Sequence, residues 1–374
     1  MLKLRCNILI IFAVAVLATA LFMPITPVYA SGLSLTIVAK NRIYTFSNLE
    51  ISCYNNKYYL NDCNDIVDGI YLDTVSRPKD SEVVFLNDNS GNFYITKSAM
   101  GSEFDKQALI RDIDYALNNN LSKVVVKFHT TYPKTNEEDL KKQTCLRSAF
   151  TTYFFNSTQG RKDNIKLSAE KINGTKISKG EEFSFNKKVG KRTEENGFKN
   201  AKIILNGDFI DGIGGGVCQV STTLYNCALL SGLKITEQHS HSLSVSYIEP
   251  SFDAMVNSIT SDLKFLNDTN GDIYISAVAT DNKITFKIYG KEKLEEYERV
   301  SVVTNTTSPE PFLEFEDDTI PFGERLITQY PKDGIESEGY LIKYINGVRV
   351  NNYKIRSDKY SPVRGKILVG KQQA

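Results

Sequence analysis

Cys218 is the clearest candidate nucleophile in this 374-residue chain, because it follows the glycine run Gly214-Gly215-Gly216 where a helix is expected to begin. A thiol becomes reactive when its surroundings favour the thiolate, as the unpaired N–H groups and positive dipole end of a helix N-terminus do. Glycines also let the backbone approach a substrate closely, and their amides can hold an oxyanion. The pattern therefore predicts acyl transfer by a cysteine. The alternative is a tight turn before a buried helix whose cysteine is inert.

The predicted helix, residues 218–231, carries a polar face beside this cysteine. Residues three, four and seven positions after Cys218 lie on its face of the helix, and a face this polar is unusual beside a cysteine. The residues of this helix that we predict to contact a substrate are Gln219, Ser221, Thr222 and Tyr225.

A cysteine of this kind needs a base, and the sequence offers three histidines, His129, His239 and His241. A Cys–His catalyst requires a ring within hydrogen-bond reach, often oriented by a carboxylate. His239 and His241 alternate at an expected strand entry, so at most one faces Cys218, and Asp253 follows as the orienting carboxylate. A zinc site of Cys218 with both histidines conflicts with this alternation and lacks a fourth ligand. We therefore expect neither a metal nor another cofactor.

Residues 1–30 have the pattern of a targeting segment. Lys3 and Arg5 precede an uncharged apolar run of sixteen residues, and Val28-Tyr29-Ala30 fits the small-residue rule for signal peptidase. Because a bilayer span needs about 20 residues, we predict cleavage after Ala30. An uncleaved anchor is the alternative and would be the one membrane contact. The net charge of +1 gives no reason to expect a nucleic-acid partner, so we predict a secreted or cell-wall-associated, extracytoplasmic protein.

Removal of that leader leaves five cysteines, so at least one thiol stays unpaired in an exported protein. Cys53 and Cys63 flank a short predicted hairpin and either form a disulfide or are both buried thiols. Cys227 lies about 900° round the helix from Cys218, at roughly 100° per residue, and is predicted to pack in the core.

The segments around the candidate site resemble the VanW domain over about residues 150–290. The motifs that carry the resemblance are Gly180-Glu181-Glu182-Phe183-Ser184-Phe185-Asn186, Val189-Gly190, Arg192-Thr193, Gly197-Phe198, Gly214 to Asn226, His241-Ser242, Val245, Tyr247 and Asp253-Ala254. Two departures stand out. Cys227 occupies a position where the family usually has a small residue, and Ser251 one where it usually has glycine.

We predict an α+β, multidomain chain. After the signal peptide, residues 31–135 resemble a peptidoglycan-binding-like domain, residues 146–292 form the VanW domain, and residues 298–372 resemble a β-rich G5 domain. The G5 resemblance is carried by Pro321-Phe322-Gly323 and by Tyr360-Ser361-Pro362-Val363-Arg364-Gly365. Within these domains we expect helices at 104–117 and at 164–172 with Asp163 as N-cap, a hairpin turn at Asn206-Gly207, and strands at 243–248, 273–278 and 283–289.

Some clostridial VanW proteins resemble L,D-transpeptidases of peptidoglycan. The resemblance implies that Cys218 attacks the L,D peptide carbonyl of a tetrapeptide stem, releases D-alanine, and passes the acyl group to another stem as a 3-3 crosslink. His241 is implied as the base, with His239 in reserve, and Tyr247 as a residue of the substrate site. Arg192 either binds a stem carboxylate or forms an ordinary surface salt bridge.

The partners implied are peptidoglycan stem peptides and glycan. Two other functions stay open on the sequence alone. One is a non-catalytic peptidoglycan-binding or scaffold protein, in which the glycine loop only shapes a groove. The other is a thiol hydrolase of the same peptides, with water replacing the acceptor amine.

Overall fold

The computed structural model describes residues 27–29, 34–86, 88, 90–205 and 208–371. The predicted apolar run, the cleavage point after Ala30 and the Asn206-Gly207 turn therefore lie outside the described residues. The chain divides into two compact units. One contains the described residues up to Ser81 together with Lys97–Asn136, and the other contains Glu82–Thr96 and residues from Glu137 onward. Both combine helices with sheets, which confirms the predicted α+β class.

The first unit packs two helices against two three-stranded sheets, ordered β1-β4-β5 and β3-β2-β9, and also contains the pair β10-β8. Its core follows from strand alternation, since Leu35, Ile37 and Ala39 on β2 are fully buried. Its elements are β1 (Pro27–Tyr29), β2 (Ser34–Ala39), β3 (Arg42–Ser47), β4 (Glu50–Tyr54), β5 (Lys57–Leu60), α2 (Cys63–Thr74), β8 (Gly101–Glu103), α3 (Lys106–Asn118), β9 (Lys123–Val125) and β10 (His129–Thr131).

Cys53 and Cys63 are free thiols in this unit. Cys53 lies on β4 and is half-buried, whereas Cys63 begins α2 and is buried, which raises the pKa of its thiol to about 11. Cys53 lies on the first strand of the hairpin that β4 and β5 form, and Cys63 follows the hairpin as a separate thiol.

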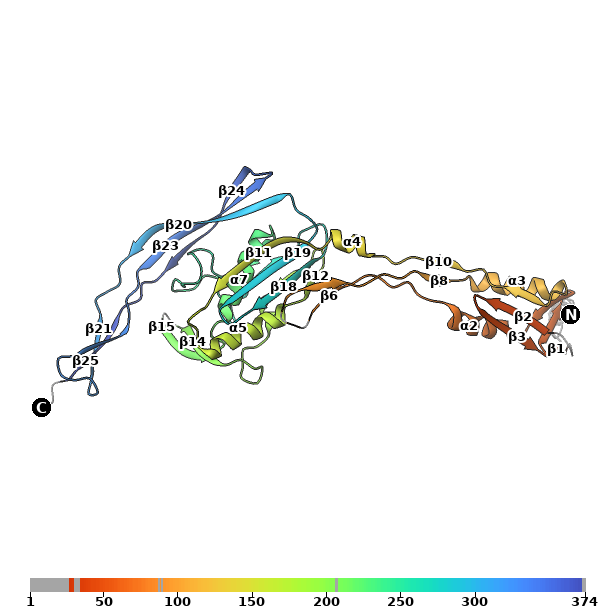
Figure 1. Cartoon of the computed structure of the whole chain (residues 1–374), viewed down its shortest axis with the longest axis horizontal. Coiled ribbons are helices and arrows are strands. Elements are labelled where there is room, and N and C mark those ends of the chain that lie inside the picture. The colour runs from red at the N-terminus through yellow and green to blue at the C-terminus, as the bar shows by residue number, and fades with distance from the viewer. Residues whose placement is uncertain (1–26, 30–33, 87, 89, 206–207, 372–374) are drawn as a thin grey trace, which may run out of the picture. The chain divides into compact units, whose positions relative to one another are not determined.

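The second unit is built on a four-stranded antiparallel sheet, ordered β11-β19-β18-β12 (Figure 1). The unit also contains the three-stranded sheet β13-β17-β16 and the pair β14-β15. The elements are β6 (Val83–Phe85), β7 (Phe93–Ile95), α4 (Glu137–Lys142), β11 (Cys145–Tyr153), α5 (Gln159–Ile172), β12 (Thr175–Ile177), β13 (Glu182–Ser184), α6 (Phe185–Val189), β14 (Asn200–Leu205), β15 (Asp208–Ile213), α7 (Val217–Leu230), β16 (Lys234–Glu237), β17 (Lys264–Leu266), β18 (Ile273–Ala279) and β19 (Lys283–Gly290).

Helices α5 and α7 pack side by side on one face of this sheet. The strand β19 shows why, because its alternate residues Ile284, Phe286 and Ile288 are fully buried beneath the helices. The β6-β7 hairpin also packs in this unit, although we predicted it as part of the domain at residues 31–135. Phe93 stacks edge-on against Tyr289 of β19, with ring centroids 5.0 Å apart.

The C-terminal part of the second unit is β-rich. Long antiparallel strands are ordered β20-β23-β24, and a smaller sheet is ordered β21-β25-β22. These strands are β20 (Glu295–Thr307), β21 (Leu313–Asp317), β22 (Arg325–Gln329), β23 (Gly334–Ile345), β24 (Val348–Tyr360) and β25 (Lys366–Gly370). Leu341 of β23 belongs to the same buried cluster as α5 and α7, so the β-rich part shares a core with the central sheet.

Two local predictions are wrong. The helix α5 begins at Gln159 after Thr158, so Asp163 lies inside it rather than at its N-cap. Residues 243–248 form no strand despite their alternating sequence. Other elements supply hydrogen-bond partners for this segment. For example, Lys332 Nζ donates to the carbonyl oxygen of Ser244 at 2.6 Å. Among the described residues, no helix has both the length and the apolar character needed to cross a bilayer.

Candidate active site

Helix α7 places Cys218 in its first turn, directly after the glycine run. Gly216 is the N-cap and has φ 103°, a backbone conformation open chiefly to glycine. Because Cys218 is the second residue of α7, the partial positive charge of the helix N-terminus acts on its sulfur. Cys218 is partly exposed, whereas Cys227 on the same helix is fully buried, and burial raises the pKa of Cys227 to about 12. Of these two thiols, Cys218 is the accessible one.

The glycine run is required by close packing. A Cβ on Gly215 would lie 2.5 Å from the carbonyl oxygen of Lys202 on β14, and one on Gly216 would lie 3.0 Å from the carbonyl oxygen of Arg161 on α5. The amide of Gly214 is used within the fold, donating to a backbone carbonyl. The run therefore lets α7 begin tightly against β14 and α5, and Gly215 itself is buried, while the oxyanion role of the glycine amides stays a prediction.

His241 and Asp253 form a buried pair beside the cysteine. His241 Nδ1 hydrogen-bonds with Asp253 Oδ2 at 2.6 Å, and the same oxygen accepts the backbone N–H of His241 at 2.7 Å. This leaves Nε2 of the ring free of Asp253, and the imidazole and the Cys218 thiol shift each other's pKa, while Sγ of Cys218 donates to the carbonyl oxygen of Val256 at 3.3 Å. Asp253 is 1% exposed and His241 6% exposed. We call Cys218, His241 and Asp253 the triad. It extends from a partly exposed sulfur to a buried carboxylate.

The charges of the triad support one another. Burial disfavours the Cys218 thiolate, but the hydrogen bond and charge of His241, with a contribution from Arg192, outweigh burial and lower the pKa of the thiol. Burial also disfavours charged His241, yet Asp253 and Cys218 raise the pKa of the imidazole to about 9. Against the effect of burial, His241 lowers the pKa of Asp253 to about 2. The site therefore favours ionisation of the Cys218 thiol and protonation of His241.

His239 is placed differently. It is half-buried, its Nε2 lies 3.0 Å from Glu237 Oε1, and its carbonyl oxygen accepts the amide of Met255. Lys264 and then His239 lower the pKa of Glu237 to about 2. The expected strand alternation at residues 239–241 is absent, since this segment is irregular, but only His241 of the two histidines pairs with Asp253.

His241 and Asp253 both lie on an irregular segment, residues 238–256, which we call the site loop. The polar face of α7 holds it: Ser221 Oγ donates to the carbonyl oxygen of Ala254 at 2.6 Å, and the Ala254 amide donates to Thr222 Oγ1 at 2.9 Å. Ser221 and Thr222 are fully buried and Tyr225 is 3% exposed. Ser221 and Thr222, predicted to contact substrate, instead fix the loop that carries the histidine and the aspartate, while Tyr225 hydrogen-bonds with Arg356.

Two arginines flank the cysteine, and in the part of the chain that the structure describes neither forms a salt bridge with a carboxylate. Arg192 Nη2 donates to Asn186 Oδ1 at 2.6 Å, and Arg161 Nη2 donates to Gln219 Oε1 at 2.6 Å. Both guanidiniums interact electrostatically with Cys218, and burial lowers the pKa of each. The predicted substrate residue Gln219 is thus a buried bridge that orients Arg161.

Sequence reasoning missed Arg161, because it lies on α5 and reaches the site only when α5 packs against α7. Tyr247, by contrast, was singled out and does lie at the site. Its hydroxyl hydrogen-bonds with Thr222, and burial, followed by the charge of Cys218, raises its pKa well above the ordinary value.

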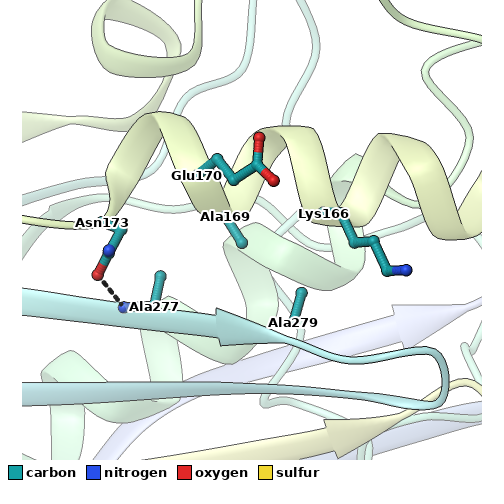
Figure 2. Close-up of a pocket in the computed structure, with 6 residues that line it drawn as sticks. All are labelled: Lys166, Ala169, Glu170, Asn173, Ala277 and Ala279. Atoms are coloured by element: carbon teal, nitrogen blue, oxygen red, sulfur yellow. Dashed lines mark hydrogen bonds between the residues drawn. The ribbon is translucent and has the colours of Figure 1, made fainter. Parts of the chain in front are cut away.

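A shallow hollow elsewhere on the unit has no such chemistry. It lies between α5 and β18, and Figure 2 shows Asn173 accepting the Ala277 amide across it at 2.9 Å. None of its lining residues belongs to the triad or to the arginine pair. Among the described residues there is also no group of three or more histidine, cysteine or acidic side chains placed to hold a metal ion.

Comparison with known proteins places this site in a family. Residues 160–289 match the family model described as VanW like protein, and residues 300–372 match the G5 domain. YoaR of Bacillus subtilis (strain 168) is 35% identical over 209 residues, which cover 55% of this chain and 68% of YoaR. The chain belongs to the VanW family. All three residues of the triad lie in the VanW domain. The G5 domain of the chain suggests a cell-surface protein.

Another relative of this VanW protein is the vancomycin B-type resistance protein VanW of Enterococcus faecalis (strain ATCC 700802 / V583). It is 30% identical over 136 residues, covering 35% of this chain and 49% of the relative. Two solved G5 domains also match. That of an IgA1 protease has 16% identity, a TM-score of 0.15 and coverage of 21% of this chain and 92% of its own. The HP0197 G5 domain has 14% identity, a TM-score of 0.13 and coverage of 20% and 95%.

Proposed function

We propose that the VanW domain is a cysteine-dependent acyltransferase of peptidoglycan stem peptides, an L,D-transpeptidase that forms 3-3 crosslinks. The observation that carries the proposal is the triad: a partly exposed Cys218 whose pKa is lowered by His241, which Asp253 orients. A thiolate paired with an imidazolium that is fixed by a carboxylate is the arrangement that acyl transfer by cysteine requires.

Acylation follows directly from this geometry. The Cys218 thiolate adds to the carbonyl carbon of the L,D peptide bond of a donor stem, and negative charge develops on the carbonyl oxygen. As the tetrahedral intermediate collapses, the C–N bond breaks and the imidazolium of His241 gives its proton to the departing nitrogen, which leaves as the amino group of D-alanine. The donor stem is then held as a thioester on Cys218.

Deacylation reverses the proton path. The side-chain amine of an acceptor stem gives a proton to neutral His241 as it attacks the thioester carbonyl, and the C–S bond breaks. An amide crosslink and the thiolate–imidazolium pair are restored, so that protons and electrons balance over the cycle. Asp253 keeps His241 in the tautomer and orientation that both steps use.

Arg161 and Arg192 support a substrate that ends in a carboxylate. Both are half-buried guanidiniums beside Cys218 that hydrogen-bond only to neutral side chains in the described part of the chain. Guanidinium groups bind carboxylates through charge-assisted and often bidentate hydrogen bonds. The terminal carboxylate of a tetrapeptide stem is one residue from the bond to be cleaved, which places it within reach of such groups.

The proposed site of action is outside the cytoplasmic membrane, at the cell wall. The N-terminal pattern of residues 1–30 and the G5 domain both support it. Peptidoglycan stem peptides and glycan are the partners that follow from this location.

The test is to incubate the purified protein with disaccharide-tetrapeptide muropeptides and to analyse the products by liquid chromatography and mass spectrometry. We expect free D-alanine and 3-3-linked dimers with the wild-type chain, and neither with Cys218→Ala. Cys145→Ala, which removes a half-buried thiol on β11, is the matched control and should retain activity.

The other outcomes are informative. Product formation that persists in Cys218→Ala contradicts the mechanism. Free D-alanine or tripeptide without dimers identifies a hydrolase and contradicts crosslinking. Binding to purified sacculi that is equal in wild type and Cys218→Ala, with no product from either, identifies a non-catalytic wall-binding protein.

A further inference from the structure

We propose that the C-terminal G5 domain is part of the active centre, with Arg356 and Tyr360 of β24 acting as positioning residues for the triad carboxylate. The inference rests on the proposed cysteine chemistry. It adds a role for a domain that the comparisons describe separately from the VanW domain.

Asp253 is hydrogen-bonded from two sides. Its Oδ2 serves His241, while its Oδ1 accepts Tyr360 Oη–H at 2.6 Å and Arg356 Nη2–H at 2.9 Å. Arg356 Nη1 also donates to the backbone carbonyl oxygen of Asp253 at 2.6 Å. The carboxylate is therefore fixed in position and in rotation by two residues that lie more than a hundred positions further along the chain.

Both positioning residues are themselves held. Arg356 has a side chain only 9% exposed, and its Nε forms an ion pair with Asp358 on the same strand. Tyr360 is 2% exposed, and its oxygen accepts the backbone N–H of Ser251 at 2.8 Å. Asp253 therefore has little freedom to turn, because Arg356 is buried with two acidic partners and Tyr360 both donates and accepts a hydrogen bond.

The rest of the site loop depends on the same domain. The amide of Ser361 donates to the Ser242 carbonyl oxygen at 2.8 Å, and Ser301 Oγ donates to the Pro250 carbonyl oxygen at 2.7 Å. Ser242 follows His241 directly, and Pro250 lies three positions before Asp253. Because the loop has no strand of its own in this stretch, these contacts take the place of a sheet ladder.

Positioning and electrostatics predict opposite effects on Cys218. Removing the Arg356 charge, with the geometry unchanged, would strengthen the pull of Asp253 on the His241 proton and would lower the pKa of Cys218 further. If Arg356 and Tyr360 act by orientation, their loss lets the carboxylate and then the imidazole turn away from the sulfur. The pKa of Cys218 then rises toward that of an ordinary thiol.

The experiment measures the rate of Cys218 alkylation by iodoacetamide from pH 4 to pH 10, read as modified peptide by mass spectrometry in the full-length chain. We compare wild type with Tyr360→Phe, which changes no charge, and with Arg356→Gln. We expect the midpoint of the rate profile to rise by about one pH unit or more in both variants, which corresponds to an approximately tenfold lower rate below the midpoint. Crosslinking of muropeptides should fall in parallel.

The matched controls lie on the same strand. Tyr353→Phe and Lys354→Gln alter an exposed tyrosine and an exposed ion pair with Glu338, and both should keep the wild-type midpoint. Thermal unfolding identifies any variant that fails to fold; Tyr360→Phe, the smaller change, then decides. An unchanged midpoint in folded Tyr360→Phe, or a lower midpoint in Arg356→Gln, overturns the proposal. Since alkylation needs no peptidoglycan substrate, a shifted midpoint without crosslinking would reject the proposed function and keep this inference.

Discussion

Ser251 Oγ hydrogen-bonds with Ser337 Oγ at 2.8 Å, joining the site loop to β23 of the G5 domain. Ser251 adopts φ 65°, a left-handed conformation that is unfavourable for residues other than glycine. The VanW resemblance has glycine at this position, so the backbone conformation is a feature that glycine would satisfy without strain. In this chain the residue is a serine, so the backbone is strained there. Its hydroxyl, however, forms a contact between the two domains, two residues before Asp253.

Substitution of Ser251 should separate these two effects. Ser251→Ala keeps the strain and leaves Ser337 Oγ buried without its partner, so we expect a loss of about 1–3 kcal/mol in the free energy of unfolding. Ser251→Gly should be less destabilising by about 0.5–1 kcal/mol, because the left-handed strain of about 1–2 kcal/mol exceeds the entropy cost of glycine. Denaturant unfolding measures both, with exposed Ser246→Ala as the control. Equal stability of the alanine and glycine variants would contradict this explanation.

The His241–Asp253 pair should make stability depend on pH. Against burial, its partners raise the pKa of His241 from 6.5 to about 9, so its contribution is complete below pH 6.5 and is lost as pH rises through about 9. The pKa of Asp253 is lowered from 3.8 to about 2, so its contribution is complete above pH 3.8 and is lost as pH falls through about 2. The stability difference between wild type and His241→Gln should therefore be largest between about pH 4 and 6.5. Urea unfolding at a series of pH values tests this, and a difference that grows between pH 7 and 10 would contradict it.

The sequence predicted the position of Cys218 better than the arrangement around it. Helix periodicity and the glycine run located Cys218 at a helix start, and these are local properties of the chain. The pairing of His241 rather than His239 with Asp253 depends on the path of the irregular site loop, which has no periodicity to read. Arg161 and Arg356 reach the site only through tertiary packing, so no spacing along the chain indicates them.

The polar face of α7 shows the same limit. Ser221 and Thr222 were correctly placed on the face of Cys218, but a helical wheel does not reveal what covers that face. The site loop covers this face. The predicted substrate surface is therefore a buried, hydrogen-bonded contact between α7 and the site loop.

The packing role of the glycine run predicts a large stability effect at Gly215. Gly215→Ala would place a Cβ 2.5 Å from the Lys202 carbonyl oxygen and 2.8 Å from the Ala201 Cβ, so α7 or β14 must shift. We expect a loss of about 2 kcal/mol or more, typical of overpacking a buried site. Gly271→Ala is the matched control, because its added Cβ would find its nearest neighbours at 3.9 Å. Thermal unfolding compares the two, and a Gly215→Ala variant as stable as Gly271→Ala would show that the run is not held by packing.

The arginine pair should determine whether the proposed reaction requires a terminal carboxylate on the donor stem. Losing one charge-assisted hydrogen bond costs about 1.5–3 kcal/mol, so Arg161→Gln and Arg192→Gln should each raise KM for the natural tetrapeptide stem by approximately 10- to 100-fold. The same variants should change KM little for a stem that ends in D-alanine amide, which has no carboxylate to bind. Arg192 also helps to lower the pKa of Cys218, so its variant should lose kcat on both substrates.

Lys191→Gln removes an exposed positive charge next to Arg192 and is the control for general electrostatic attraction. It should leave KM for both stems near the wild-type value at physiological salt, because exposed charges are screened there. Steady-state kinetics on the carboxylate and amide stems distinguishes the cases. If the arginine variants lose affinity equally for both stems, the pair does not recognise the carboxylate and serves only to hold Gln219 and Asn186 in place.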